Sequence, residues 1–166
     1  GKNCTTSDDG LKVIAETDGM VVMEQDKISI SDIFTIEAVN VNSGNIQFNG
    51  SVVVKRDVEM GYSLISNGNI QINGNAEKCI LKSGGDIFIK GGLIGKASEG
   101  GVTAGNDFVA KFAENAEITA SGNAVIYEGV LNCKVMSGKQ VVASGKNGNI
   151  IGGEIIAAEG VEASTL

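Results

Sequence analysis

Histidine is absent from all 166 residues, so the side chains that remain for chemistry are carboxylates, cysteines and one glycine-rich lysine segment. Neither a Ser-His-Asp triad nor a Cys-His pair can form without an imidazole. The segment Gly91–Ser98 resembles a phosphate-binding loop. However, Lys90 stands where the first glycine of that motif belongs, and Ala97 follows Lys96. We interpret this segment as a turn, and we expect a protein that is not an enzyme, with no catalytic residues, no cofactor and no small-molecule substrate.

Three carboxylates, Asp86, Asp107 and Glu154, occupy equivalent positions in the repeat described below. Stacked carboxylates could bind Ca²⁺, which takes six to eight oxygen ligands. Four uncharged residues share the column and interrupt the acidic run: Asn45, Asn69, Ala124 and Gln140. The repeat also lacks the glycine and aspartate pattern of calcium-binding β-rolls. We therefore interpret the carboxylates as turn residues and expect no metal site.

The three cysteines, Cys4, Cys79 and Cys133, are an odd number without metal-type spacing, which favours a reducing, cytoplasmic setting. Cys79 and Cys133 each precede a repeat glycine by five residues. Because they belong to coils three steps apart, we expect a separation of roughly 14 Å at the ~4.8 Å strand spacing. A disulfide needs Cα atoms within ~7 Å, so we predict free thiols that fill the core.

The chain is acidic, with a net charge of −7, a pI near 4.6 and Arg56 as its only arginine. This charge disfavours nucleic-acid binding, which depends on basic clusters. The sequence contains neither an apolar run of ~18 residues nor a Lys/Arg-rich amphipathic helix, so we expect no membrane partner.

A glycine-led strand signal recurs seven times between residues 43 and 157. Glycine or asparagine comes first, as residues that tolerate positive φ, and three strand residues follow a polar one. The lead apolar residues, spaced by 14 to 24 residues, are Ile46, Ile70, Ile87, Phe108, Val125, Val141 and Ile155. Stacked coils would bury the first and third strand residues in continuous columns.

These repeats predict an all-β fold, a right-handed parallel β-helix of about seven coils over residues 41–166. Residues 1–40 read instead as an N-terminal β cap over the first coil, because solenoid ends expose unpaired strand edges. The strands expected there are Leu11–Ala15, Met20–Met23, Ile28–Ile30 and Ile33–Ile36.

The sequence resembles the β-helix region of the flagellar assembly protein A (FapA) family, often described as a domain of unknown function. The segments that carry the resemblance are 1–3, 15–19, 43–52, 83–87, 91–95 and 145–153. They follow in order over nearly the whole chain. The resemblance implies a bacterial protein connected with flagellar assembly or placement, in which the solenoid lies between an N-terminal domain and C-terminal helical segments.

The middle position of each repeated strand should point outward, yet it is apolar in five coils. These residues form a candidate interface stripe: Phe88, Val109, Ile126, Val142 and Ile156. One interpretation is a local bulge or a covering loop of the same chain. The other is an interface, either a dimer contact or a docking face for another domain.

We therefore expect a non-catalytic structural or protein-interaction module of a bacterial cytoplasmic protein, which binds a protein partner or forms a homo-oligomer. The first alternative is a self-polymerising scaffold similar to bactofilin solenoids. The second alternative is a polysaccharide-active β-helix enzyme, which the absence of tryptophan disfavours.

Overall fold

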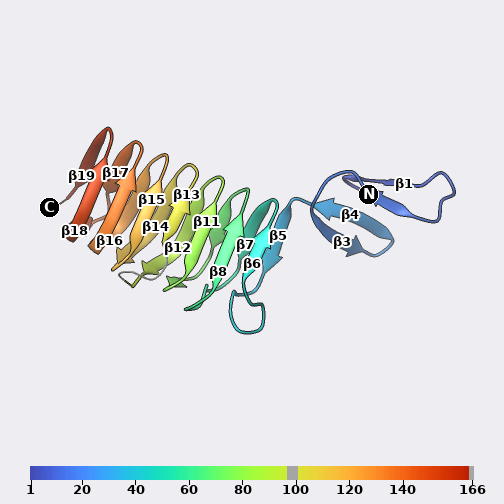
Figure 1. Ribbon diagram of the computed structural model, residues 1–166, viewed down its shortest axis with the longest axis horizontal. Helices are drawn as coiled ribbons and strands as arrows, with labels where there is room; N and C mark the ends of the chain where they lie inside the picture. The colour runs from blue at the N-terminus through green and yellow to red at the C-terminus, as the bar shows by residue number, and fades with distance from the viewer. Residues whose placement is uncertain (97–100, 165–166) are drawn as a thin grey trace.

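The computed structural model describes residues 1–96 and 101–164, and within these ranges the chain forms strands and turns without any helix. Figure 1 shows the strands stacked side by side along one long axis, with two hairpins at the N-terminal end. The strands of the stack pair in parallel, and together they form a β-solenoid of about seven turns. The predicted fold class is therefore confirmed.

Each coil contributes strands to three faces, which we number so that the chain runs from face one to face three and then to face two. The strands of face one are β5 (Ile33–Ile36), β7 (Ser51–Val54), β9 (Ile70–Ile72), β17 (Gln140–Ala143), β19 (Gly160–Ala163) and the first parts of β12 (Ile87–Ile94), β14 (Phe108–Glu114) and β16 (Ala124–Ser137). The strands of face two are β6 (Ile46–Phe48), β8 (Ser63–Ser66), β11 (Ile80–Ser83), β13 (Val102–Ala104), β15 (Glu117–Ala120) and the last parts of β16 and β18 (Asn149–Ala157). Face three consists of β10 (Ala76–Glu77), the remaining parts of β12, β14, β16 and β18, and bridges through Val39 and Val58.

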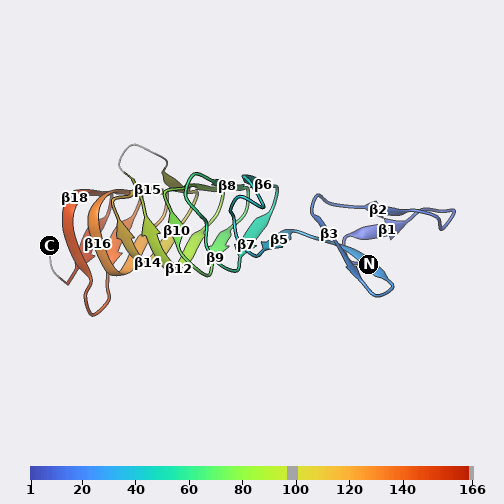
Figure 2. The same ribbon diagram turned by 90° about the horizontal axis from the view of Figure 1, so that it is seen from below.

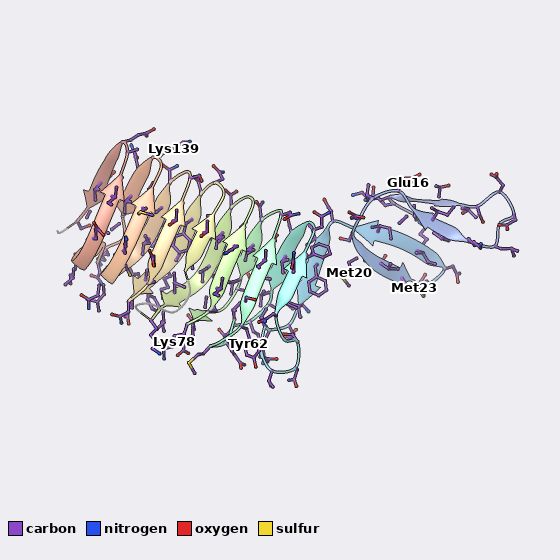
Figure 3. The ribbon with its side chains drawn as sticks, viewed as in Figure 1. Glu16, Met20, Met23, Tyr62, Lys78 and Lys139 are labelled. Carbon is purple, nitrogen blue, oxygen red and sulfur yellow. The ribbon has the colours of Figure 1, made fainter. Side chains whose placement is uncertain are left out.

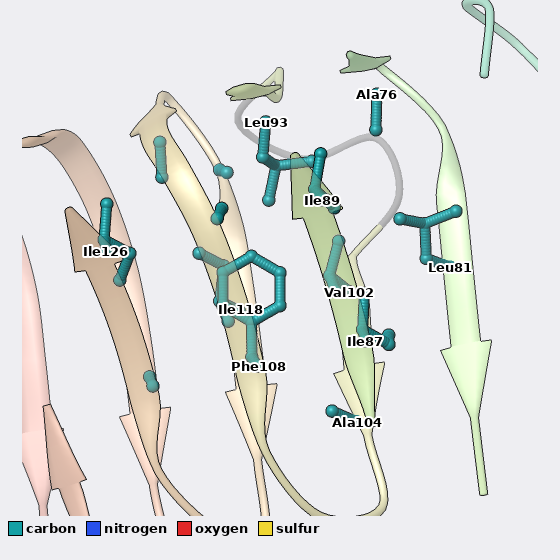
Figure 4. Close-up of a cluster of buried hydrophobic side chains, with 14 of the residues drawn as sticks. Ala76, Leu81, Ile87, Ile89, Leu93, Val102, Ala104, Phe108, Ile118 and Ile126 are labelled. Carbon is teal, nitrogen blue, oxygen red and sulfur yellow. The ribbon is translucent and has the colours of Figure 1, made fainter. Parts of the chain in front are cut away.

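The core follows from the alternation of side chains along each strand. On face one, the first inward column contains, in order, Val52, Ile70, Ile87, Phe108, Ala124 and Val141, all buried. Phe108 is the largest fully buried side chain, and it pairs along the ladder with the small Ala124 on one side and with Ile87 on the other. Figure 4 shows its ring within the apolar cluster between the faces.

In five of the seven repeats the glycine serves close approach rather than positive φ, which corrects in part the reason given above for their recurrence. Gly44 in the first repeat and Gly152 and Gly153 in the last do have positive φ, as expected. Neither Gly85 nor Gly122 has positive φ. A Cβ on Gly85 would lie 2.1 Å from the side-chain oxygen of Asn69, and one on Gly122 would lie 2.1 Å from that of Asp107. Glycine recurs at this turn because the coil before it fills the space of a side chain.

Three of the seven lead residues are placed differently from the sequence expectation. Ile46 and Ile155 lie on face two, where they pair with Leu64 and Val135. Val125 lies on face one but one position late, since Ala124 pairs with Phe108. With these corrections the face-one column recurs every 16 to 21 residues, so the extreme spacings came from mixing two faces.

The N-terminal region forms two antiparallel hairpins that extend beyond the solenoid end, as Figure 2 also shows. They consist of β1 (Cys4–Thr6), β2 (Val13–Ala15), β3 (Met20–Glu24) and β4 (Lys27–Ser31). Met23, labelled in Figure 3, is 71% exposed on the second hairpin. The side-chain amide of Asn49 donates a hydrogen bond to Asp18 at 3.0 Å and so connects the hairpins to the first coil.

One expected cap strand, Ile33–Ile36, belongs instead to the solenoid, because β5 pairs in parallel with β7. Within the same first coil the rings of Phe34 and Phe48 lie 5.5 Å apart, partly buried against the end of the core. An aromatic pair in the first coil thus helps to close the end that the cap was expected to cover. The division into a cap of residues 1–40 and a solenoid of residues 41–166 stays a prediction.

Candidate functional site

The outward side of face one carries the candidate site. The middle residue of each face-one strand points outward. In the parallel register it lies beside the middle residue of the next coil, so these residues form a column. This column, which we call the face-one stripe, contains Val53, Gln71, Phe88, Val109, Val125 and Val142. It ends at Thr35 before the first of these residues and at Glu162 after the last.

The structure brings three of the five predicted stripe residues together and separates the other two. Phe88, Val109 and Val142 lie in the face-one stripe, as expected. Ile126 points into the core and is fully buried. Ile156 lies on face two, where it pairs with Met136 and is 49% exposed. Both misplacements come from the same register errors that misplaced Val125 and Ile155. The interface role of the column stays a prediction.

Val53 and Val125 belong to the stripe but were missed from the sequence. In the run Val52-Val53-Val54 all three residues are apolar, so alternation alone does not show which one points outward. For Val125 a usable signal existed. The lead residue Ile87 follows Gly85 by two positions, and the same count from Gly122 would have placed Ala124 inward and Val125 outward.

The face-one stripe presents apolar surface to solvent. Phe88 is 41% exposed, and the four valines are partly buried by their neighbours. Gln71 interrupts the column and donates a hydrogen bond to Asn73 at 2.9 Å. Because neighbouring strands lie ~4.8 Å apart, the stripe extends about 24 Å along the solenoid.

Polar residues border the stripe on both sides, two positions before and two positions after each outward residue. In the two central coils the sequence of outward residues is acid, apolar, lysine: Asp86, Phe88, Lys90 and then Asp107, Val109, Lys111. The ammonium of Lys111 lies 3.4 Å from Glu128. Lys55, in an earlier coil, lies 3.5 Å from Glu37.

The acidic edge is also a hydrogen-bonded ladder that joins successive coils. The side-chain oxygen of Asn69 accepts the backbone N–H of Asp86 at 2.8 Å, and Asp86 accepts that of Asp107 at 3.1 Å. Asp107 then accepts the backbone N–H of Asn123 at 2.7 Å. Each side chain thus satisfies a backbone donor at the turn of the next coil.

Two members of the expected acidic column lie elsewhere. Glu154 is on face two, 3.9 Å from the ammonium of Lys134. Asn45 precedes a face-two strand and accepts the backbone N–H of Ser63. The residues of ranges 1–96 and 101–164 contain no group of three or more acidic, cysteine or histidine side chains arranged to hold a metal ion. The ladder supports the interpretation of Asp86 and Asp107 as turn residues.

The cysteine prediction is confirmed, since Cys79 and Cys133 are free and buried. Each directly precedes its face-two ladder segment, and three pairing steps separate Leu81 from Val135. Burial raises the pKa of the Cys79 thiol to about 12. Burial also raises the pKa of Cys133. Neutral thiols of this kind are poor nucleophiles, which suits a packing role.

The lysine-containing segment that resembles a phosphate loop is a turn only in part, because Gly91–Ile94 continue strand β12. Its glycines serve packing. A Cβ on Gly92 would lie 2.1 Å from the ring of Phe112 on the next coil, so the ring lies against the bare backbone. Ala97 and Ser98 lie outside the described residues.

A family model described as the flagellar assembly protein A (FapA) beta solenoid domain matches residues 32–166. Searches of curated proteins and of solved structures found no significant match. No helix among the described residues is long and apolar enough to span a membrane. The matched region begins at the solenoid's first strand and covers well over half of the chain, so the resemblance is confirmed and this protein belongs to the FapA beta solenoid family.

Proposed function

We propose that this chain is a non-catalytic protein-interaction module of a bacterial cytoplasmic protein, that it acts in flagellar assembly or placement, and that the face-one stripe is its contact surface. Membership of a family described by flagellar assembly supports the broad role. The observation that carries the site is the outward column of apolar side chains around Phe88, because apolar surface gathered on an outer face is typical of a docking surface.

Binding at this surface would draw on burial of apolar area, at about 25 cal/mol per Å² removed from water. Phe88 is the natural anchor, because its ring is the largest side chain of the stripe and is 41% exposed. The charges at the stripe edges, from Asp86 and Asp107 to Lys90 and Lys111, would select the orientation of the partner.

The first alternative, a self-polymerising scaffold, has support in the strand edge of the first coil. Within the described ranges β5 pairs only with β7, so its other edge is free. The hairpins of residues 4–31 extend from the N-terminal end, however, where a stacked neighbour would lie (Figure 1). We therefore favour lateral contact through face one over end-to-end growth.

The second alternative, a polysaccharide-active enzyme, would use a hollow of about 510 Å³ on face three, lined in part by Phe112, Glu114 and Glu128. Glycoside hydrolysis needs one carboxyl group to stay protonated as a general acid. Glu128 lies 3.4 Å from the ammonium of Lys111, so one of the two carboxylates of the hollow is already engaged in an ion pair. This hollow supports the enzyme hypothesis less well than the stripe supports docking.

The proposal is tested in flagellated cells that produce this protein with the substitutions Phe88→Gln and Val109→Thr. Gln71 already occupies the same column, so glutamine is compatible with the fold at this position. We expect fewer or misplaced flagella, counted by electron microscopy, at an unchanged protein level.

The matched control is Thr103→Gln, an exposed outward position on face two, which should leave flagella normal. Normal flagella in the stripe variant would contradict the proposal. Equal defects in both variants would also contradict it, because they would show that face one has no special role.

A further inference from the structure

We infer that the partner of face one is a second copy of this chain, packed stripe against stripe with the two solenoid axes parallel. The inference rests on the proposed use of face one for docking and names its occupant. It is carried by the distribution of charge on both sides of the stripe.

The two central coils have the same outward pattern, with an aspartate two residues before the apolar centre and a lysine two residues after it. Asp86 and Lys90 border Phe88, while Asp107 and Lys111 border Val109. At ~3.3 Å per residue, each charged position lies about 7 Å from the stripe centre, on opposite sides. The face therefore has an acidic edge and a basic edge at equal distances from an apolar midline.

A two-fold axis parallel to the solenoid axis makes this pattern self-complementary. Such a rotation reverses the strand direction and keeps the level of every coil. Phe88 then faces Phe88 of the other copy, Asp86 faces Lys90, and Asp107 faces Lys111. By symmetry each pairing occurs twice, which gives four ion pairs around an apolar centre. Two-fold symmetric contacts of this kind are the commonest form of homo-oligomer.

The opposite orientation brings like charges together. A two-fold axis along the strands, through the middle of the stripe, places the level of Phe88 against the level of Val109. Asp86 then faces Asp107, and Lys90 faces Lys111. Like charges placed in contact across an interface disfavour that arrangement, so electrostatics selects the parallel one. In the other coils of the stripe no acidic residue occupies the border positions, which are Ser51, Lys55, Asn69, Asn73, Asn123, Tyr127, Gln140 and Ser144.

Both lysines are available for the new pairs. Lys90 is exposed and makes no ion pair with any residue of the described ranges. Lys111 pairs with Glu128, but both side chains are 52% exposed. Exposed pairs contribute little free energy, so Lys111 can exchange its partner without a large cost.

The size of the face predicts a weak dimer. Six coils at ~4.8 Å and five residues at ~3.3 Å give a flat area of roughly 475 Å² for each copy. Stable complexes bury about 800 Å² on each partner, so we expect dissociation at micromolar or higher concentration.

Cysteine cross-linking tests the orientation, because Val53 and Val142 lie at opposite ends of the stripe, five coils apart. The native cysteines are buried, so a short bismaleimide should react only at introduced thiols. We expect Val53→Cys and Val142→Cys each to form covalent dimers alone. A mixture of the two, tagged to differ in size, should give no cross-linked heterodimer. Thr103→Cys on face two is the control and should stay monomeric.

Sedimentation velocity over a concentration series completes the test. We expect a monomer–dimer equilibrium that shifts at least tenfold toward monomer in the Lys90→Glu, Lys111→Glu double variant and that weakens with added salt. A monomer at every concentration would overturn the inference, as would cross-linking only between Val53→Cys and Val142→Cys, or equal cross-linking of the Thr103→Cys control. If the protein is monomeric but stripe variants still disturb flagella, the docking proposal stands and the partner is a different protein.

Discussion

Phe88 and Phe108 lie on neighbouring coils of face one but on opposite sides of the sheet. Phe108 is fully buried, whereas Phe88 is 41% exposed. Replacing Phe108 with alanine removes a whole core side chain and leaves a cavity, which typically costs 3–5 kcal/mol, so we expect about 4 kcal/mol here. Phe88→Ala removes a ring that already contacts water and leaves no enclosed cavity, so we expect about 1 kcal/mol.

Urea unfolding followed by circular dichroism measures both variants at low protein concentration, where any association through face one is minimal. The predicted difference of about 3 kcal/mol corresponds to a factor of more than 100 in the folding equilibrium constant. Equal losses, or a larger loss for Phe88→Ala, would refute the register on which the face-one stripe depends. An unchanged denaturant slope is needed for the comparison, since a solenoid can lose cooperativity.

Three further predictions concern the turns and the core. Gly105→Ala should lower the thermal midpoint, checked by calorimetry, because its Cβ would lie 2.3 Å from the backbone oxygen of Gly84; an unchanged midpoint would argue against the close approach. Asp107→Ala should lower the free energy of unfolding in urea by about 1–2 kcal/mol, because the backbone N–H of Asn123 loses its acceptor. Asp107→Asn keeps an acceptor oxygen and should be near neutral. Stabilisation of the natural chain by added Ca²⁺ would instead favour a metal site. The Cys79 thiol has a pKa of about 12 in the folded protein and about 8.5 in the unfolded chain, so it stabilises the folded state fully at pH values below about 8.5. This stabilisation is lost as pH rises from about 8.5 toward 12. The natural chain should therefore lose its stability advantage over Cys79→Ala in that pH range. A constant difference between these two proteins across alkaline pH would contradict it.

The fold could be predicted because each coil repeats the same short strand with one apolar side. A single short strand cannot bury its apolar side, so stacking is the available solution. The free state of Cys79 and Cys133 followed from the same coil count. The candidate site was predicted less well, because a shift of one residue moves a side chain to the other side of a sheet. Ile126 in the core illustrates that sensitivity.

Local sequence also could not distinguish one face from another. Ile46 and Ile155 follow glycine signals much as Ile87 does, yet they pair on face two. Positive φ explains the glycines of the first and last repeats, Gly44 and Gly152. In the five repeats between them the role of the glycine depends instead on the position of the preceding coil. Asn69 and Asp107 fill the space beside Gly85 and Gly122, and these contacts join residues about 16 positions apart.

The sequence by itself determined that this chain is a stacked parallel solenoid of one known family, with buried thiols and without histidine chemistry. Repetition, alternation and composition are visible in the sequence, and they are sufficient for the fold, the free thiols and the absence of histidine chemistry. The family followed from the resemblance of particular segments, which the family model confirms. Only the tertiary structure decided which outward residues share one column. The identity of the stripe depends on pairing between coils, where a one-residue choice such as Ala124 or Val125 reverses inside and outside.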